Sequence, residues 1–415
     1  MVITQNEKIL LRELARQYAE IANLDIQKIS INRMRATNDL KIVRPPVLIH
    51  EIPWHEMDID GQLQLHCNHP FAKQMEWYFR STLFQWKYFR GDMVVQPYYP
   101  IQKAFTDSGI GLDVNGSQIA TDKNNNIVSH EYHDILATED DLAKIKLPNF
   151  ERQPEIDEQN ITLAKDILQD ILPIRLCGVE IYYSPWDQIP RYRGVEPIFM
   201  DMVDRPEFLH QIIQKFTEIG LHTINEYERL GLLDCDLPTL HCTPAYTSDL
   251  PAKDYTGGVV RLKDVWFRSM AQMFSSISPS MHQEFDLDYS SKLMEKCGLV
   301  YYGCCEPLDN KIGILKKIPN LRKVGVSPWA NVESCAEQLE GNYVYARKPN
   351  PANVAIKTDS EEIRKEIITT INACQKHNCP VEFVLKDIST VSFNPYNLVV
   401  WEKTVREVLD EYYGV

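Results

Sequence analysis

Two adjacent cysteines followed by a glutamate and a proline stand out in the segment YYGCCEPLDN, residues 301–310. The segment closes an apolar run that is typical of a buried strand. Thiolates, imidazoles and carboxylates are the ligands of Zn²⁺, and a catalytic zinc has three protein ligands and one open position. Cys304, Cys305 and Glu306 are therefore candidates for a metal site or a reactive thiol, and buried structural thiols are the alternative.

The orientation of the two thiols depends on where the strand ends. Because successive strand residues face opposite sides, Cys304 and Cys305 do not both face one site if the strand continues through them. We then expect one of them to pack beneath a helix. A nearby Arg347 or Lys348 would lower the pKa of a thiol or bind a substrate carboxylate. Further candidate ligands on other segments are His241, Cys242, Glu284 and Asp387.

Apolar strand-like runs alternate with helical patterns from residue 170 onward. This alternation predicts parallel strands joined by crossover helices, in a sheet covered on both faces. With two runs further upstream, the strand candidates are residues 46–53, 92–99, 174–183, 237–246, 299–305, 321–328, 343–349 and 381–388. Eight strands favour a closed (β/α)₈ barrel, or TIM barrel, over an open doubly wound sheet, because no glycine-rich turn follows an early strand.

Two additions to the barrel are expected. Residues 1–45 read as an N-terminal helical extension, and the barrel then occupies residues 46–415. Within it, residues 111–136 contain two alternating runs around DKNNN, and asparagine tolerates the left-handed backbone of a tight turn. This segment predicts an inserted β-hairpin, which would form a lid or a dimer contact.

The net charge, the cysteine count and the lack of certain motifs argue against several classes of protein. A formal net charge of −14 argues against a nucleic-acid partner, because phosphate binding needs a basic stripe. No run of about 18 apolar residues is present to span a membrane, and the first residues lack the apolar core of a signal peptide. We therefore expect a cytoplasmic protein whose ten cysteines are mostly reduced. No P-loop, HExxH or GxSxG motif supports an ATP-dependent enzyme, zinc protease or serine hydrolase.

In a (β/α)₈ barrel the active site lies at the C-terminal ends of the strands. Residues at the predicted strand ends then become candidates. Asp387 would act as a general base or metal ligand, although a salt bridge is the structural alternative. The candidate catalytic residues are Asp387, Glu306 and Arg347, and the candidate substrate-binding residues are Tyr183, Trp186, Arg191, Tyr246 and Trp329. The aromatic members would line an apolar pocket, and an arginine would hold a carboxylate.

The order of YYGCCEP, IPNLRKVGVSPW, EQLEGNYVYARKPNP and VEFVLKDIST resembles the C-terminal half of the uroporphyrinogen decarboxylase superfamily. The nearest branch is the corrinoid-linked methyltransferase-like and uncharacterised one, and PWHEMD and SPWDQIPRYRG extend the resemblance over most of the chain. It implies a single (β/α)₈ barrel. Methylcobalamin:coenzyme M enzymes of this superfamily hold zinc with a His-x-Cys motif and a later cysteine. That motif falls here on Tyr302, Gly303 and Cys304, and the later position on Asp387 or Ser389, so only one cysteine matches.

The resemblance implies a zinc-dependent methyltransferase that demethylates a small substrate, for which an aromatic methoxylated compound is one candidate. The methyl group would pass to a corrinoid (cobalamin) protein. If zinc is bound, we expect a different ligand set, drawn from Cys304, Cys305, Glu306, Glu284, His241 and Asp387. A cofactor-free decarboxylase or lyase, with Asp387 or Glu306 as acid or base, is the alternative, and a non-catalytic binding protein is a third. The expected partners are a small-molecule methyl donor and a corrinoid protein, and a homodimer is compatible with the family and the hairpin.

Overall fold

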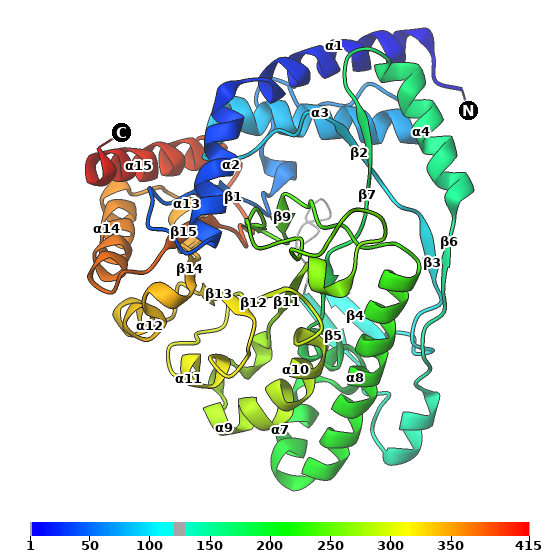
Figure 1. The fold of residues 1–415 in the computed structure, drawn as a ribbon, viewed down its shortest axis with the longest axis vertical. Helices are drawn as coiled ribbons and strands as arrows, with labels where there is room; N and C mark the ends of the chain where they lie inside the picture. Colours follow the sequence, from blue (N-terminus) through cyan, green and yellow to red (C-terminus); the bar gives the residue numbers. More distant parts are fainter. Residues whose placement is uncertain (1, 120–128, 415) are drawn as a thin grey trace.

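The computed structural model describes residues 2–119 and 129–414 (Figure 1). At its centre lies a curled sheet of seven parallel strands. In spatial order these are β8 (Ile181–Tyr182), β11 (Trp266–Ser269), β12 (Leu299–Tyr302), β13 (Leu321–Val326), β14 (Val344–Arg347), β15 (Val381–Leu385) and β1 (Val47–Ile49). Every position of β11, β12, β14 and β15 is buried, as expected for parallel strands that are covered on both faces.

The sheet is a half-barrel, so the expectation of a closed eight-stranded barrel needs correction. Among the described residues, the sheet ends at β8 on one side and at β1 on the other. Residues 237–246, expected as a barrel strand, form the antiparallel hairpin of β9 (Thr239–Leu240) and β10 (Thr243–Pro244). Pro238 and Pro244 lack the N–H that a central strand donates, which explains the difference. The barrel strand that the sequence pattern missed is β11.

The other strands form three two-stranded sheets. Strand β2 (Tyr99–Gln102) pairs in parallel with β7 (Ile174–Cys177), and β3 (Phe105–Asp107) pairs antiparallel with β6 (Phe150–Arg152). Strands β4 (Gly116–Ile119) and β5 (Ser129–Tyr132) are antiparallel, with Gly116 opposite Tyr132, within the segment where a hairpin was expected. The predicted turn DKNNN lies outside the described residues.

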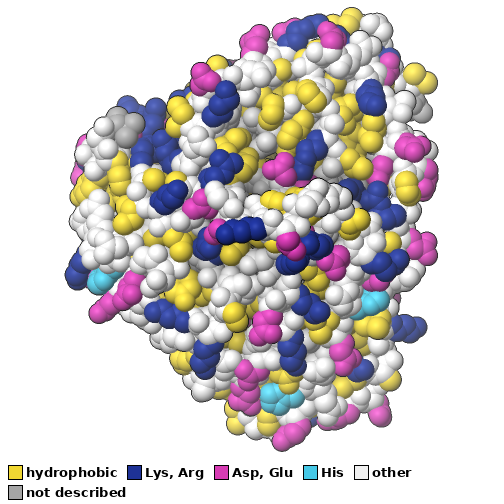
Figure 2. Space-filling model, in the orientation of Figure 1, with side chains coloured by type: hydrophobic (Ala, Val, Ile, Leu, Met, Phe, Trp, Pro, Cys, Tyr) yellow, Lys and Arg dark blue, Asp and Glu magenta, His cyan; other side chains and the backbone are white. Residues whose placement is uncertain are grey.

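The longer helices surround the half-barrel (Figure 1). They are α1 (Gln5–Ala22), α2 (Asp25–Asn38), α3 (Pro70–Phe89), α4 (Pro154–Leu168), α7 (Val195–Asp204), α8 (Pro206–Arg229), α10 (Asp288–Met294), α12 (Val332–Leu339), α14 (Ser360–Lys376) and α15 (Tyr396–Tyr413). One-turn helices are α5 (Pro185–Gln188), α6 (Pro190–Arg193), α9 (Pro279–His282), α11 (Ile312–Leu315) and α13 (Ala352–Ala355). None of the helices described is long and apolar enough to cross a membrane. Basic and acidic side chains are interspersed on the face shown in Figure 2.

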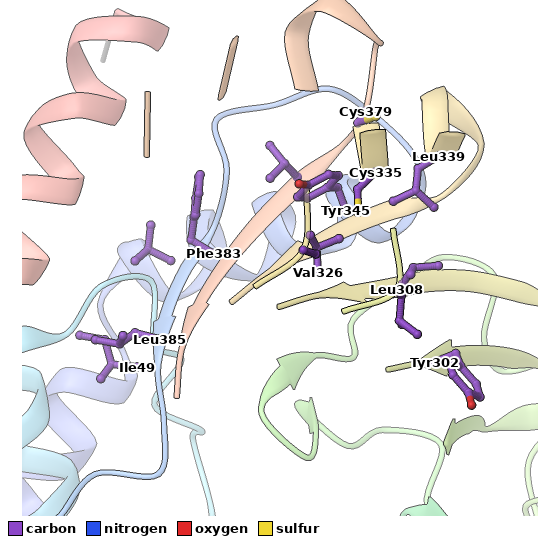
Figure 3. Close-up of a cluster of buried hydrophobic side chains, with 14 of the residues drawn as sticks. Ile49, Tyr302, Leu308, Val326, Cys335, Leu339, Tyr345, Cys379, Phe383 and Leu385 are labelled. Atoms are coloured by element: carbon purple, nitrogen blue, oxygen red, sulfur yellow. The ribbon is translucent and has the colours of Figure 1, made fainter. Parts of the chain in front are cut away.

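The two faces of the sheet bury different partners. Figure 3 shows one face, where Phe383, Leu385 and Tyr345 belong to a cluster shared with Leu339 of α12. Full burial of each such side chain stabilises the fold by roughly 1.5–3 kcal/mol. On the other face, Leu240 of the β9–β10 hairpin packs with strand residues that include Tyr301 and Ala346. The hairpin therefore fills the inside of the half-barrel.

A single carboxylate joins the start of α1 to the loop before α3. Glu7 accepts hydrogen bonds from the backbone N–H groups of Thr4 at 2.7 Å, Asn68 at 2.7 Å and His69 at 3.1 Å. These bonds favour the charged form and lower the pKa of Glu7 from 4.5 to about 2. The helical extension is thus attached to the rest of the chain by bonds that require an ionised carboxylate.

We predict that Glu7→Gln lowers the melting temperature at neutral pH, because an amide oxygen accepts these bonds less well than a carboxylate. A lowered pKa stabilises the folded state above pH 4.5, and this contribution is lost as the pH falls toward about 2. The difference between wild type and variant, followed by calorimetry, should therefore shrink with acidification through this window. A difference that grows on acidification would contradict the role of Glu7.

Candidate active site at the strand ends

The two adjacent thiols lie in a loop that leaves strand β12. Gly303 turns the chain with a φ of +99°, and a Cβ there would lie 2.6 Å from a side-chain carbon of Leu308. Only glycine adopts this backbone without strain. Because the strand has ended, its alternation no longer applies, and the sulfurs of Cys304 and Cys305 approach to 3.5 Å. The expectation that one thiol packs beneath a helix is therefore replaced by a thiol pair, with Cys304 buried and Cys305 half-buried.

Asp387 completes a group of three, although its strand is separated from β12 by β13 and β14. It follows strand β15, and its Oδ2 accepts a hydrogen bond from the Cys305 thiol at 2.7 Å. One possible ligand atom from each of Cys304, Cys305 and Asp387 lies within 4.8 Å of the other two. Two thiols and a carboxylate at this spacing are a donor set that suits zinc.

A buried ammonium group lies against this trio. Lys386 is 3 % exposed, and its Nζ lies 2.9 Å from Cys304 Sγ and 3.2 Å from Asp387 Oδ1. A hydrogen bond from Cys305 and the positive charges of Lys386 and Arg268 outweigh burial and lower the pKa of Cys304 from 9.0 to about 4. The same arrangement raises the pKa of Cys305, because its ionisation would place a second negative charge beside the first. Cys304 is thus the thiolate of the pair.

Glu306 holds the loop rather than facing the thiols. Its carboxylate is 1 % exposed and accepts hydrogen bonds from the backbone N–H groups of Cys304 at 2.9 Å and Ala271 at 3.2 Å. Burial and the neighbouring Cys304 raise its pKa from 4.5 to about 7. Both oxygens accept backbone hydrogen bonds, so Glu306 positions the loop, and its expected catalytic role stays a prediction.

Glu51 and His241 connect the site to the open edges of the sheet. Glu51 follows β1, accepts a hydrogen bond from the backbone N–H of Asp387 at 2.9 Å and lies 3.4 Å from Lys386 Nζ. Burial opposes its ionisation, but hydrogen bonds from His241 and Asp387 and the charge of Lys386 keep the pKa of Glu51 well below its usual range. His241, between β9 and β10, contacts Glu51 at 2.9 Å through Nε2 and donates its backbone N–H to Glu180, just before β8, at 2.6 Å. His241 therefore bridges the gap in the half-barrel.

Two of the other proposed polar residues lie away from the thiols. Arg347 is buried and binds the Ser327 carbonyl at 2.6 Å and Glu366 of α14 at 2.9 Å, so it serves a structural ion pair. Glu284 is 51 % exposed and contacts His210 of α8 at 3.2 Å. Neither residue belongs to the group around Cys304.

The proposed substrate-binding residues do not form one pocket. Trp186 is buried and donates Nε1–H to the Phe285 carbonyl at 3.1 Å, and Tyr183 is buried within the core. The Tyr246 hydroxyl bonds to Gln96, and the ring lines a cavity of about 280 Å³ that also contacts Val265 and Trp266, at the opposite, N-terminal end of β11. Arg191 is exposed at the surface, and Trp329 is 69 % exposed after the end of β13.

Sequence reasoning missed Arg268 and Tyr182 as site residues. Arg268 belongs to the unrecognised strand β11, and its guanidinium carbon lies 4.6 Å from the centre of the Tyr182 ring. The Tyr182 hydroxyl donates to Asp187 at 2.6 Å. The sequence did contain a signal for this site, which is the arginine in the largely apolar segment VWFRS. A charged residue is rarely buried in a strand unless it has a partner.

Comparison with known proteins supports the fold. No protein-family model matches the chain, and no curated protein matches its sequence. Among solved structures, a methyltransferase from Methanosarcina mazei is similar, with 12% sequence identity and a TM-score of 0.51, over 92% of this chain and 99% of that one. At this identity the match shows a shared fold, which extends over nearly the whole of both chains.

We predict that Lys386→Met raises the pKa of Cys304 in metal-free protein, because the variant lacks the ammonium that favours the thiolate. The ultraviolet absorbance of the thiolate should then appear at a higher pH than in wild type, whose pKa is about 4. Lys292→Met, at an exposed position of α10, is the control and should titrate as wild type. An unchanged midpoint in the Lys386 variant would show that the ammonium does not set the charge of the thiol.

Proposed function

We propose that this protein is a zinc-dependent methyltransferase. It would move a methyl group from a small methyl donor, such as an aromatic methyl ether, to a corrinoid carried by a partner protein. The observation that carries the proposal is the trio of Cys304, Cys305 and Asp387, with ligand atoms within 4.8 Å of one another. The trio lies at the C-terminal strand ends, where enzymes of barrel folds hold their active sites. The fold shared with a methyltransferase supports the same reading.

The charges around the trio fit a zinc ion. Cys304, Cys305 and Asp387 would supply three protein ligands and leave one position open for substrate. Two thiolates and a carboxylate carry one negative charge more than Zn²⁺ neutralises. The ammonium of Lys386, which contacts Cys304 and Asp387, supplies the remaining positive charge.

Each residue then has a defined task in methyl transfer. When bound, zinc supplies a Lewis acid that withdraws charge from the donor oxygen. Lys386 holds the Cys304 sulfur as a thiolate, and Glu51 orients both Lys386 and the backbone of Asp387. The corrinoid of the partner protein would supply the nucleophile that accepts the methyl group. The electron pair of the broken oxygen–carbon bond would stay on the donor oxygen, which would take a proton from solvent.

A cofactor-free lyase is the second candidate. The observation in its favour is that Lys386 already neutralises the Cys304 thiolate without a metal. A pKa of about 7 would also allow Glu306 to exchange a proton near neutral pH. The two candidates differ in their need for metal, so metal content separates them.

We predict that the purified protein contains about one zinc ion per chain, because three ligands of this kind bind zinc. Cys305→Ser and Asp387→Asn should each lower the zinc content measured by elemental analysis well below wild type. Cys235→Ser is the matched control, because Cys235 is a half-buried thiol that lines the cavity with Trp266 instead. Zinc that persists when Cys304 and Cys305 are both replaced would exclude this site.

The activity can be measured with free cob(I)alamin and a methoxylated aromatic compound. We expect the zinc-loaded protein to form methylcobalamin, seen in the visible spectrum, and Cys305→Ser to abolish the reaction while Cys235→Ser retains it. Release of carbon dioxide from a carboxylated substrate by metal-free protein, without any corrinoid, would instead support the lyase.

A further inference from the structure

Three buried hydrogen-bond donors inside the half-barrel have no partner among the described residues. They are Nε of Arg268, Nζ of Lys348 and the hydroxyl of Tyr301. The exposed fractions of these residues are 2 %, 1 % and 0 %. Burying a charge without a partner is strongly unfavourable, so two such cations inside one sheet indicate a missing anion.

The three groups lie close together. Arg268 and Tyr301 are opposite each other on the paired strands β11 and β12, so their side chains share one face of the sheet. Lys348 follows β14, and its Nζ lies 5.5 Å from the centre of the Tyr301 ring. The thiol of Cys242 lies among them: burial raises its pKa, and the charges of Lys348, Lys386 and Arg268 oppose this rise. We call Arg268, Tyr301 and Lys348 the cradle.

The neighbouring cations are already neutralised, which sets the cradle apart. Lys323 pairs with Glu382 at 2.8 Å, and Lys386 contacts Cys304, Asp387 and Glu51. By contrast, neither Arg268 nor Lys348 forms an ion pair with a carboxylate of residues 2–119 or 129–414, and the anion whose charge acts on Arg268 is the Cys304 thiolate. An arginine, a lysine and a phenol together present N–H and O–H donors of the kind that bind a carboxylate.

We propose that the cradle binds the carboxylate of the substrate, so that the methyl donor is a small carboxylic acid. The role of this acid as methyl donor rests on the proposed function, whereas the carboxylate site rests on the cradle alone. Tyr301 is near the end of β12, Cys304 follows in the next loop, and the charge of Arg268 acts on the Cys304 thiol, so a carboxylate held here would place the rest of the molecule near the thiols. The ring centre of Tyr182 lies 4.6 Å from the guanidinium carbon of Arg268, and Tyr182 is itself 39 % exposed, so it connects the cradle to the surface.

The proposal is tested by binding of simple probes, independently of catalysis. Acetate and benzoate, each beside its neutral amide, are titrated calorimetrically into wild-type protein as purified. We expect at least one acid to bind about tenfold or more tightly than its amide, since a hydrogen bond to a charged group outweighs a neutral one by this order. Lys348→Met should remove that preference, and Lys292→Met, at an exposed position of α10, should keep it. Equal binding of both acids and their amides would overturn the proposal.

Thermal melting separates a binding role from a structural one. Lys348→Met removes an unpaired buried charge, so the ligand-free variant should melt at or above the temperature of wild type. Lys323→Met is the matched contrast, because it leaves Glu382 buried without its cation and should lower the melting temperature. A fall with Lys348→Met as large as that with Lys323→Met would assign the lysine to the fold and overturn the proposal.

The two proposals fail in different ways. If the protein prefers acids through Lys348 but holds no zinc, the carboxylate site is supported and the methyltransferase proposal is contradicted. If the protein holds zinc through Cys305 but binds acids and amides equally, the metal site is supported and the carboxylate-binding role of the cradle is contradicted.

Discussion

The candidate site depends on one buried ammonium group. Lys386 contacts a thiolate and two carboxylates, each supplied by a different loop at the end of the sheet. Without this cation, Cys304, Glu51 and Asp387 would place three negative charges close together at the end of the sheet, where they would repel one another. The position of Lys386, directly after a fully buried strand, fixes the charge where the three loops meet.

The gap in the half-barrel is the second determinant. In a closed barrel, neighbouring strands would cover the edges of β1 and β8, whereas here the β9–β10 hairpin enters the interior. Asn38 of α2 fastens it by donating to the carbonyls of Pro244 and Tyr246 at 3.0 and 2.8 Å. The helical extension therefore supports the hairpin that carries His241, and through His241 it supports Glu51.

The strands that carry the site were easier to predict from the sequence than whether the sheet closes into a barrel. Apolar runs before Cys304 and Asp387 predicted strands β12 and β15. Because the active site of a barrel lies at the C-terminal strand ends, both residues were predicted to lie in it. Strand β11 was missed because four residues with a central arginine lack the apolar run of a buried strand. The role of Arg347 depended on which face of β14 its side chain takes. A slip of one residue reverses that face, so strand limits read from sequence do not decide it.

Glu51 and Asp387 are joined by a hydrogen bond across 336 residues of chain. Such a contact forms only after a very large loop has closed, and loops of this length close late because of their entropy. The site is therefore among the last parts of the molecule to assemble as the chain folds. A nascent chain in which strand β15 has not yet been synthesised lacks both Lys386 and Asp387, so Cys304 and Cys305 have neither the ammonium nor the carboxylate beside them until that strand has joined the sheet.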